Sequence, residues 1–419
     1  MPSAKLHLGL LLPFAAAYFL SYFFRSANAV IGPELANDLG LSAGDLGLLT
    51  STYLLAFCLA QLPLGMLLDR FGARRVESAL LLIAATGAAL FAIADDMAAL
   101  ATARAIIGLG VSACLMAAFK AFSQWYPPER QASLTGWMMT SGGLGALAAT
   151  APLEALLHLS GWREIFGVLA VATLASAAWL FFGIPERPAQ VAHTANAATS
   201  APENLAAQWR GVCQVFSSAH FWRFAPLGLT MTGGFMAVQG LWSMAWLMQV
   251  NGYSRAVAAD HLAAMSFAML FTYIGIGLLA TRLARRGIAP VRLFASGVGL
   301  SMLMLGLITF ETLSNTTLLW VAYGLCAGFG TLGYSQTAAG FPLQLAGRAT
   351  TTYNLLVFAG GFGAQWGMGL LIDLLTDLGQ SEANALRVVF KALLTLQLMA
   401  YGWFIYSGLK IREPHNRFH

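Results

Sequence analysis

Charge is what this sequence lacks most. Lys, Arg, Asp and Glu make up 10% of its 419 residues, whereas 58% of the residues are hydrophobic and the mean hydropathy is +0.68. A soluble domain carries roughly 25% charged residues. The composition therefore excludes a soluble monomer and predicts a chain that crosses a lipid bilayer many times.

Cysteines and catalytic motifs are scarce as well. The four cysteines lie in expected helices or in a linker and lack metal-ligand spacing, so neither a disulfide nor a metal site is expected: Cys58, Cys114, Cys213 and Cys326. The glycines of 141–149 follow no strand and precede no Gly-Lys-Ser/Thr, which excludes a nucleotide-binding loop. No Ser/His/Asp set is apparent. We expect no enzyme activity and no cofactor.

Long apolar runs are abundant. Twelve segments are each long enough to span a bilayer, which takes about 20 residues: 8–32, 46–68, 76–94, 98–123, 133–157, 162–184, 222–249, 257–281, 291–311, 316–341, 349–375 and 384–408. Lys5 before the first run also suits a signal peptide, but the run is too long and no cleavage site clearly ends it. The predicted fold class is an all-α membrane protein with twelve transmembrane helices in two pseudo-symmetric six-helix halves.

Basic residues orient the chain. If the N-terminus is cytoplasmic, sixteen of the 23 Lys and Arg residues lie on cytoplasmic segments, and only Arg163, Arg255 and Arg387 lie at outer ends. This bias is the positive-inside rule. It predicts cytoplasmic N- and C-termini in a bacterial inner (plasma) membrane. The net charge of +5 then reflects topology, and no nucleic-acid partner is expected.

The helices divide six and six. Residues 185–221 are rich in Pro, Ala, Ser and Thr and read as a cytoplasmic linker, with an amphipathic piece at 205–217, between halves at 1–184 and 222–419. LGMLLDRFGARR at 64–75 recurs as IGLLATRLARRG at 276–287. Duplicated halves around a midplane site are the architecture of many secondary transporters.

Two motifs carry a family resemblance. GMLLDRFGARR resembles the signature between the second and third helices of the major facilitator superfamily, and RAIIGLG at 104–110 resembles its fourth-helix motif. The resemblance covers essentially the whole chain. It implies a transporter whose halves rock to expose one site to each side in turn, with these gating residues: Gly65, Asp69, Arg70, Arg74 and Arg104.

Asp69 is the expected cytoplasmic latch. The eleventh helix is expected to begin nearby, at about Ala349 to Thr352, and its unpaired N–H groups attract a carboxylate. The resemblance implies that this contact forms when the cytoplasmic side closes. Gly65 would let helices approach closely, and Arg104 would tie helices together within the first half. The alternative is that the basic residues only anchor topology.

Arg25 is a charge inside the first apolar run. It lies five residues beyond the middle of a helix over 8–32, roughly 7.5 Å toward the outer side. It could snorkel to the head groups or line a cavity and attract an anion. YFFRSANAVIGPEL resembles the first helix of anion:cation symporters and organophosphate antiporters, which implies that Arg25 binds a carboxylate or phosphate. In the second half, the position that matches Arg25 is Ala237. The resemblance implies two arginines where the substrate is a phosphate, so a single arginine favours a carboxylate.

Further polar and aromatic residues are expected at the substrate. Asn28 shares a face with Arg25, and Gln239 and Trp242 form a stripe on the seventh helix. Tyr53 and Gln336 complete the predicted set. Other buried groups are more readily explained as hydrogen bonds between helices: Tyr334, Asn354, Gln365 and Tyr273. Lys120 is expected to snorkel, although a role at the inner mouth of the cavity stays open.

The coupling ion is open between a proton and sodium. Proton coupling needs a carboxylate or histidine exposed alternately to each side, and the candidates all lie near outer helix ends: Glu34, Glu154, Asp373 and His261. The acidic residue that precedes the arginine in many symporters is Phe24 here. The glycine-proline motif of antiporters is absent from the fifth helix, which argues against drug efflux.

The sequence predicts a secondary active transporter that moves a small organic anion by alternating access, as a monomer. One alternative is an exporter or exchanger of a neutral or zwitterionic metabolite or short peptide. Another, of a different class, is a transporter-like membrane receptor. The tail after residue 408 is only about eleven residues long, which disfavours a receptor with a large sensing domain.

Overall fold

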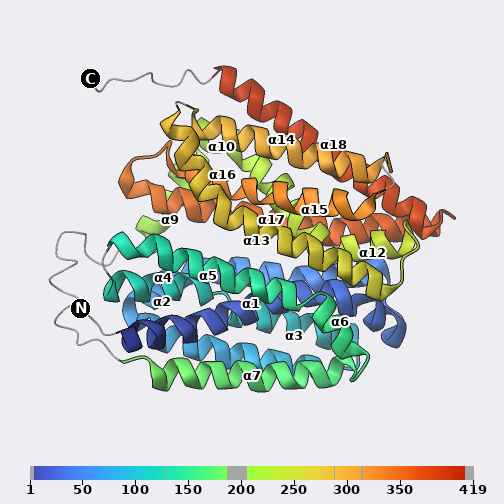
Figure 1. Cartoon of the computed structure of the whole chain (residues 1–419), viewed down its shortest axis with the longest axis horizontal. Coiled ribbons are helices and arrows are strands. Elements are labelled where there is room, and N and C mark those ends of the chain that lie inside the picture. Colours follow the sequence, from blue (N-terminus) through green and yellow to red (C-terminus); the bar gives the residue numbers. More distant parts are fainter. Residues whose placement is uncertain (1–3, 127, 186–204, 287, 313–314, 411–419) are drawn as a thin grey trace.

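The computed structural model describes residues 4–126, 128–185, 205–286, 288–312 and 315–410, and this part of the chain contains helices and no strand. In a bilayer the backbone has no water to bond to, so continuous helices satisfy its N–H and C=O groups internally. The helices lie side by side in two bundles, one coloured blue to green and the other yellow to red (Figure 1).

The first bundle consists of seven helices: α1 (Ala4–Leu39), α2 (Ala43–Ala92), α3 (Met97–Gly110), α4 (Cys114–Trp125), α5 (Pro128–Ala148), α6 (Ala151–Leu157) and α7 (Trp162–Gly183). α2 contains two spans, because Gly72 turns the chain back with φ of 79°. α3 and α4 together form the fourth predicted helix, and α5 and α6 the fifth.

The second bundle follows in the same order: α10 (Ala219–Leu227), α11 (Gly233–Ala237), α12 (Ser243–Gln249), α13 (Arg255–Arg285), α14 (Pro290–Thr309), α15 (Thr316–Ala327), α16 (Leu332–Ala338), α17 (Leu343–Asp377) and α18 (Glu382–Lys410). The π-turns η1 (Gly228–Thr232) and η2 (Val238–Trp242) join α10, α11 and α12 into the seventh predicted helix. The 3₁₀ turn η3 (Gly328–Thr331) joins α15 and α16 into the tenth.

All twelve predicted helices are present, and nine helical segments of the described chain are long and apolar enough to cross a membrane. The main error in the predicted bounds concerns α1, which continues through Pro33 to Leu39. A transmembrane helix tolerates proline where neighbouring groups satisfy the freed carbonyl.

Each bundle has its own hydrophobic core. One core gathers residues from Leu10 to Ile184 with Phe358 added, and the other gathers residues from Val215 to Phe404 with Ala29 added. α1 begins and α18 ends at the same end of the bundles, toward the left of Figure 1. We call this end the terminal end and the opposite one, where α2 begins and α17 finishes, the distal end.

The predicted amphipathic piece is helical. α9 (Leu205–Phe216) lies inside the predicted linker and packs against α17. Val215 on α9 is buried in the second core, whereas Arg210 and Cys213 are exposed. The other predicted linker residues at 186–204 lie outside the described part of the chain.

Candidate functional site

Arg25 lies near the middle of the apolar stretch of α1. The membrane-spanning part of this helix runs from Gly9 to Leu39, so fourteen residues separate Arg25 from its distal end and sixteen from its start. The predicted bounds stopped at residue 32, so they placed Arg25 farther from the middle of the helix than the observed bounds do. A half-buried arginine at mid-membrane cannot reach either interface by snorkelling as easily as one near a helix end.

Three aromatic rings surround the guanidinium. Its central carbon lies 4.4 Å from the centroid of Tyr22, 5.7 Å from Phe57 on α2 and 5.5 Å from Phe358 on α17. Phe57 and Phe358 stack on each other with centroids 4.6 Å apart. Because these two rings come from different bundles, the stack is a contact between the halves at the depth of Arg25.

A polar pair from the second bundle lies near this cation. The Tyr334 hydroxyl on α16 donates a hydrogen bond of 2.8 Å to Asn354 Oδ1 on α17. Tyr334 is also close enough to Arg25 and Tyr22 to interact with both electrostatically. The site thus combines a fixed positive charge from one half with a hydroxyl and an amide from the other.

This arrangement can bind a small anion with neighbouring hydroxyl groups. A guanidinium offers a planar fork that matches a carboxylate. The aromatic rings can cover apolar faces of a ligand, and Tyr334 and Asn354 can exchange hydrogen bonds with its polar groups. Within the described residues no three His, Cys, Asp or Glu side chains are grouped to hold a metal ion.

The other predicted substrate residues make contacts within the protein. Asn28 is buried and donates from Nδ2 to Thr50 Oγ1 at 2.9 Å. The buried Tyr53 hydroxyl donates to the Ser21 carbonyl at 3.0 Å. Both residues therefore link α1 to α2 beside Arg25.

On the second bundle the predicted stripe points into that bundle. Gln239 Nε2 lies 3.3 Å from Met269 Sδ on α13, and Trp242 Nε1 donates to the Gln365 carbonyl at 3.1 Å. The backbone carbonyl of Gln336 lies 3.1 Å from His220 Nε2. Within the described part of the chain, none of these contacts brings Gln239, Trp242 or Gln336 to Arg25.

Besides Asn28 and Tyr53, the residues that surround Arg25 were not in the predicted set. Tyr22 precedes Arg25 by three residues, a spacing that could have identified it as a neighbour on the same helical face. The remaining four come from helices distant in sequence and carry no local signal: Phe57, Phe358, Tyr334 and Asn354.

The distal end is closed by Asp373. Its carboxylate, near the end of α17, accepts hydrogen bonds from the backbone N–H groups of Ala43 at 3.0 Å and Gly44 at 2.8 Å. The Ser42 hydroxyl, which is the N-cap of α2, donates to the same carboxylate at 2.8 Å. The N-terminus of a helix carries partial positive charge and unpaired N–H groups, so it favours a carboxylate there.

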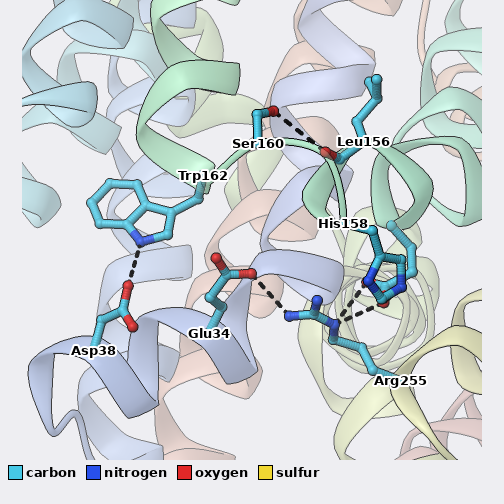
Figure 2. A network of polar contacts seen from close by, with 8 residues as sticks. Glu34, Asp38, Leu156, His158, Ser160, Trp162 and Arg255 are labelled. Carbon is cyan, nitrogen blue, oxygen red and sulfur yellow. Dashed lines mark hydrogen bonds and ion pairs between the residues drawn. The ribbon is translucent and has the colours of Figure 1, made fainter.

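A second distal contact joins the halves through Arg255, the first residue of α13. Figure 2 shows its guanidinium directed at Glu34 of the first bundle. Nη1 lies 2.9 Å from Glu34 Oε2 on α1, and Nε lies 2.8 Å from Glu154 Oε2 on α6. His158 also contacts Glu154, at 3.3 Å. Removing one partner would leave charge uncompensated in a largely buried site, so the network holds the two bundles together.

The terminal end differs, because Asp69 faces another partner. The Asp69 side chain is 71% exposed and pairs with Lys120 of α4 at 2.5 Å. α17 begins at Leu343, with Pro342 as its N-cap, so the predicted docking point at Ala349 to Thr352 lies inside the helix. Gly65 has open space around it, and the close helix approach expected there is absent in this conformation.

The remaining motif arginines contact their own bundle. Arg70 lies over the neighbouring Phe71 ring at 5.1 Å. Arg74 donates to the Ile184 carbonyl at 2.9 Å, beyond α7. Arg104 is fully buried and donates to the Phe24 carbonyl at 2.7 Å, next to Arg25 on α1. Arg104 therefore supports the helix that carries the central arginine.

Solved structures share this fold. The helices resemble those of a bacterial homologue of the human lysosomal transporter Spinster in its inward-facing, occupied conformation, with a TM-score of 0.76, 18% identity, and coverage of 99% of this chain and 100% of that one. A D-xylose–proton symporter gives a TM-score of 0.72 at 15% identity, with 94% and 97% of the two chains covered.

Relatives by sequence match a shorter segment. The probable sulfoacetate transporter of Cupriavidus necator is 27% identical over 38% of this chain and 36% of its own length. The probable L-galactonate transporter of Escherichia coli is 29% identical over 39% and 36%, and the hexuronate transporter of that organism 25% identical over 39% and 38%. The matched segment thus spans well under half of each relative. The family model described as Major Facilitator Superfamily matches residues 14–365. With most of its length matched and its helices arranged as in solved transporters, the chain belongs to the Major Facilitator Superfamily.

Proposed function

We propose that this transporter moves a small carboxylate with several hydroxyl groups, such as a sugar acid, by alternating access. The observation that carries the proposal is Arg25, a fixed cation at mid-membrane with Tyr334 and Asn354 of the other half nearby. Relatives named for hexuronate and L-galactonate transport support the same class of substrate.

We further propose that the terminal end faces the cytoplasm of a bacterium and that the structure is inward-facing. The predominance of Lys and Arg on that side supports the orientation. The contacts of Asp373 and Arg255 at the distal end, together with the exposed Asp69 at the terminal end, support the conformational assignment. Cytoplasmic termini, a monomeric state and proton coupling belong to the same proposal.

A thermal-stability screen of the detergent-purified protein tests the substrate class. The panel contains D-glucuronate, L-galactonate, D-glucarate and sulfoacetate, with D-glucose as the ligand that differs from D-glucuronate by its missing carboxylate. A ligand at 100 times its Kd stabilises a protein by about 2.7 kcal/mol. We expect at least one acid to raise the unfolding temperature of the wild type and D-glucose to have no effect.

The Arg25→Ala and Arg25→Lys variants locate the binding site. Alanine removes the charge, so we expect the stabilisation by the acid to disappear. Lysine keeps the charge but loses the planar fork, so we expect weaker binding. Arg210→Ala is the control, because the Arg210 side chain on α9 is exposed, and this variant should behave as the wild type. Equal stabilisation of the wild type and Arg25→Ala would contradict the proposal.

A further inference from the structure

A carboxyl group is buried deep in the first bundle, outside the site described above. Glu77 lies on the second limb of α2, five residues after the turn at Gly72, and is 0% exposed. Neither carboxyl oxygen makes a hydrogen bond that satisfies geometric criteria with any described residue. Burying an isolated carboxylate is very costly, and a proton removes the charge and most of that cost.

The surroundings of Glu77 contain no compensating cation within the described residues. The titratable group that interacts with its carboxyl is the Cys114 thiol of α4, which also interacts with the Ser21 hydroxyl of α1. Charged side chains on the helices packed against α2 have contacts elsewhere: Arg104 with Phe24, Lys120 with Asp69, Arg163 with Asp95, and Asp373 with Ala43.

The acidic and histidine side chains expected to carry a proton are engaged in the distal closure or beside it. Glu34 and Glu154 pair with Arg255, and Asp373 caps α2. His261 bonds to the Val257 carbonyl and to the Thr317 hydroxyl. Glu77 differs from all of these because it is fully buried and has no ion pair.

We propose that Glu77 is the proton-binding site of this transporter and that its protonation is coupled to anion binding at Arg25. The two sites communicate through α1, where Ser21 lies one turn before Arg25 on the same face. Tyr53 connects them as well, because its hydroxyl donates to the Ser21 carbonyl and lies close enough to Arg25 to interact with it electrostatically. This inference rests on the proposed function for its substrate but not for the proton site itself.

The coupling follows from charge. A bound anion places negative charge near Arg25, which makes an ionised Glu77 less favourable and a protonated one more favourable. By linkage, protonation of Glu77 strengthens anion binding by the same factor. The fully loaded state therefore contains one anion and one proton. For the two to cross together, Glu77, which is fully buried in this conformation, has to exchange its proton with the opposite side in the other conformation.

Infrared spectroscopy of the purified protein tests the proton site without any ligand. We expect the wild type to show the C=O band of a buried protonated carboxyl, and Glu77→Gln to lose it. Glu77→Asp keeps a carboxyl and should retain a shifted band. Glu154→Gln is the control, because that buried carboxylate is ion-paired, and it should leave the band unchanged. A wild type without the band, or a band that survives Glu77→Gln, overturns the proposal.

Proton uptake on ligand addition tests the coupling. D-glucuronate, or the acid from the screen that stabilises the protein best, is added to weakly buffered protein with a pH-sensitive dye. We expect proton uptake by the wild type and its loss in Glu77→Gln. Binding without proton uptake overturns the coupling. If the infrared band is present but no acid in the panel binds, the proton site stands and the proposed substrate class is wrong.

Discussion

The depth of Arg25 depends on Pro33, which does not end α1. A prediction from apolar runs stops the helix at residue 32, whereas the helix continues to Leu39. The longer helix puts Arg25 nearer to the middle of its apolar stretch. The charge itself was readable from the sequence, because a cation inside an apolar run needs an explanation. Its neighbours were not readable, since Phe358 and Tyr334 reach it from helices more than 300 residues away.

Gly108 gives a prediction at the scale of one residue. A Cβ at this position would collide with the Tyr53 carbonyl, a backbone atom that cannot move aside easily. We expect Gly108→Ala to destabilise the protein by about 1–3 kcal/mol, the usual cost of overpacking. Thermal unfolding in detergent measures the effect.

Gly167→Ala is the matched control. Gly167 lies inside α7 with open space around it, so alanine there should be neutral or stabilising by roughly 0.5–1 kcal/mol. Equal losses of stability in both variants would show that the close packing of α3 on α2 is not the cause.

At the scale of elements, α2 and α17 form a seam between the halves. Close contacts along it include Gly44 with Asp373, Leu54 with Gly361, and Cys58 with the Leu355 carbonyl. Small residues along this seam let the two helices approach closely. The helices themselves were predictable from hydrophobicity, but the seam was not, because it depends on how the two bundles are rotated against each other.

Asp373→Asn should weaken the distal end of this seam. An asparagine keeps one carbonyl oxygen but loses the charge that the α2 N-terminus favours, so we expect a loss of about 1.5–3 kcal/mol in distal closure. Spin labels are attached at Gly40 and Gln380, both exposed, after the native cysteines are replaced. Double electron-electron resonance between the two labels then measures the opening of the distal end. We expect a larger distal-open population.

Asp377→Asn serves as the comparison, because Asp377 lies one turn further along α17, is exposed and makes no hydrogen bond or ion pair with the described residues of α2. If Asp373→Asn leaves the distance distribution as it is in the wild type and in Asp377→Asn, the Asp373 contact does not control closure.

At the scale of the whole molecule, the chain belongs to the Major Facilitator Superfamily, as the resemblance of its motifs predicts. Charge scarcity, twelve apolar runs and the loop motif were enough for the fold and the family. The candidate site was only partly predictable: the charge of Arg25 is evident in the sequence, but the contacts of Gln239, Trp242 and Gln336 within their own bundle are not.

Asp69→Asn should affect the transport cycle and spare binding. In this conformation Asp69 pairs with Lys120, and closing the terminal end would bring it toward the start of α17 at Leu343. The neutral variant removes a favourable contact with the helix N-terminus, so we expect slower uptake into proteoliposomes with an unchanged Kd for the acid. A large loss of affinity would place Asp69 in the binding site instead.

The contact of Asp373 with α2 has a consequence for the carrier when it is empty. Each helix of the α2 and α17 pair holds an aspartate near its last turns. Asp373 of α17 contacts the beginning of α2 in this structure, whereas Asp69 on the first limb of α2 pairs with Lys120 and would reach the beginning of α17 only when the terminal end closes. The relative strength of these two attachments fixes how the unloaded protein divides its time between the two sides of the membrane. That division, in turn, sets the ratio of the half-saturating substrate concentrations outside and inside. Substitution of Asp69 or Asp373, both far from Arg25, thus changes whether the transporter works best at low or at high substrate concentration.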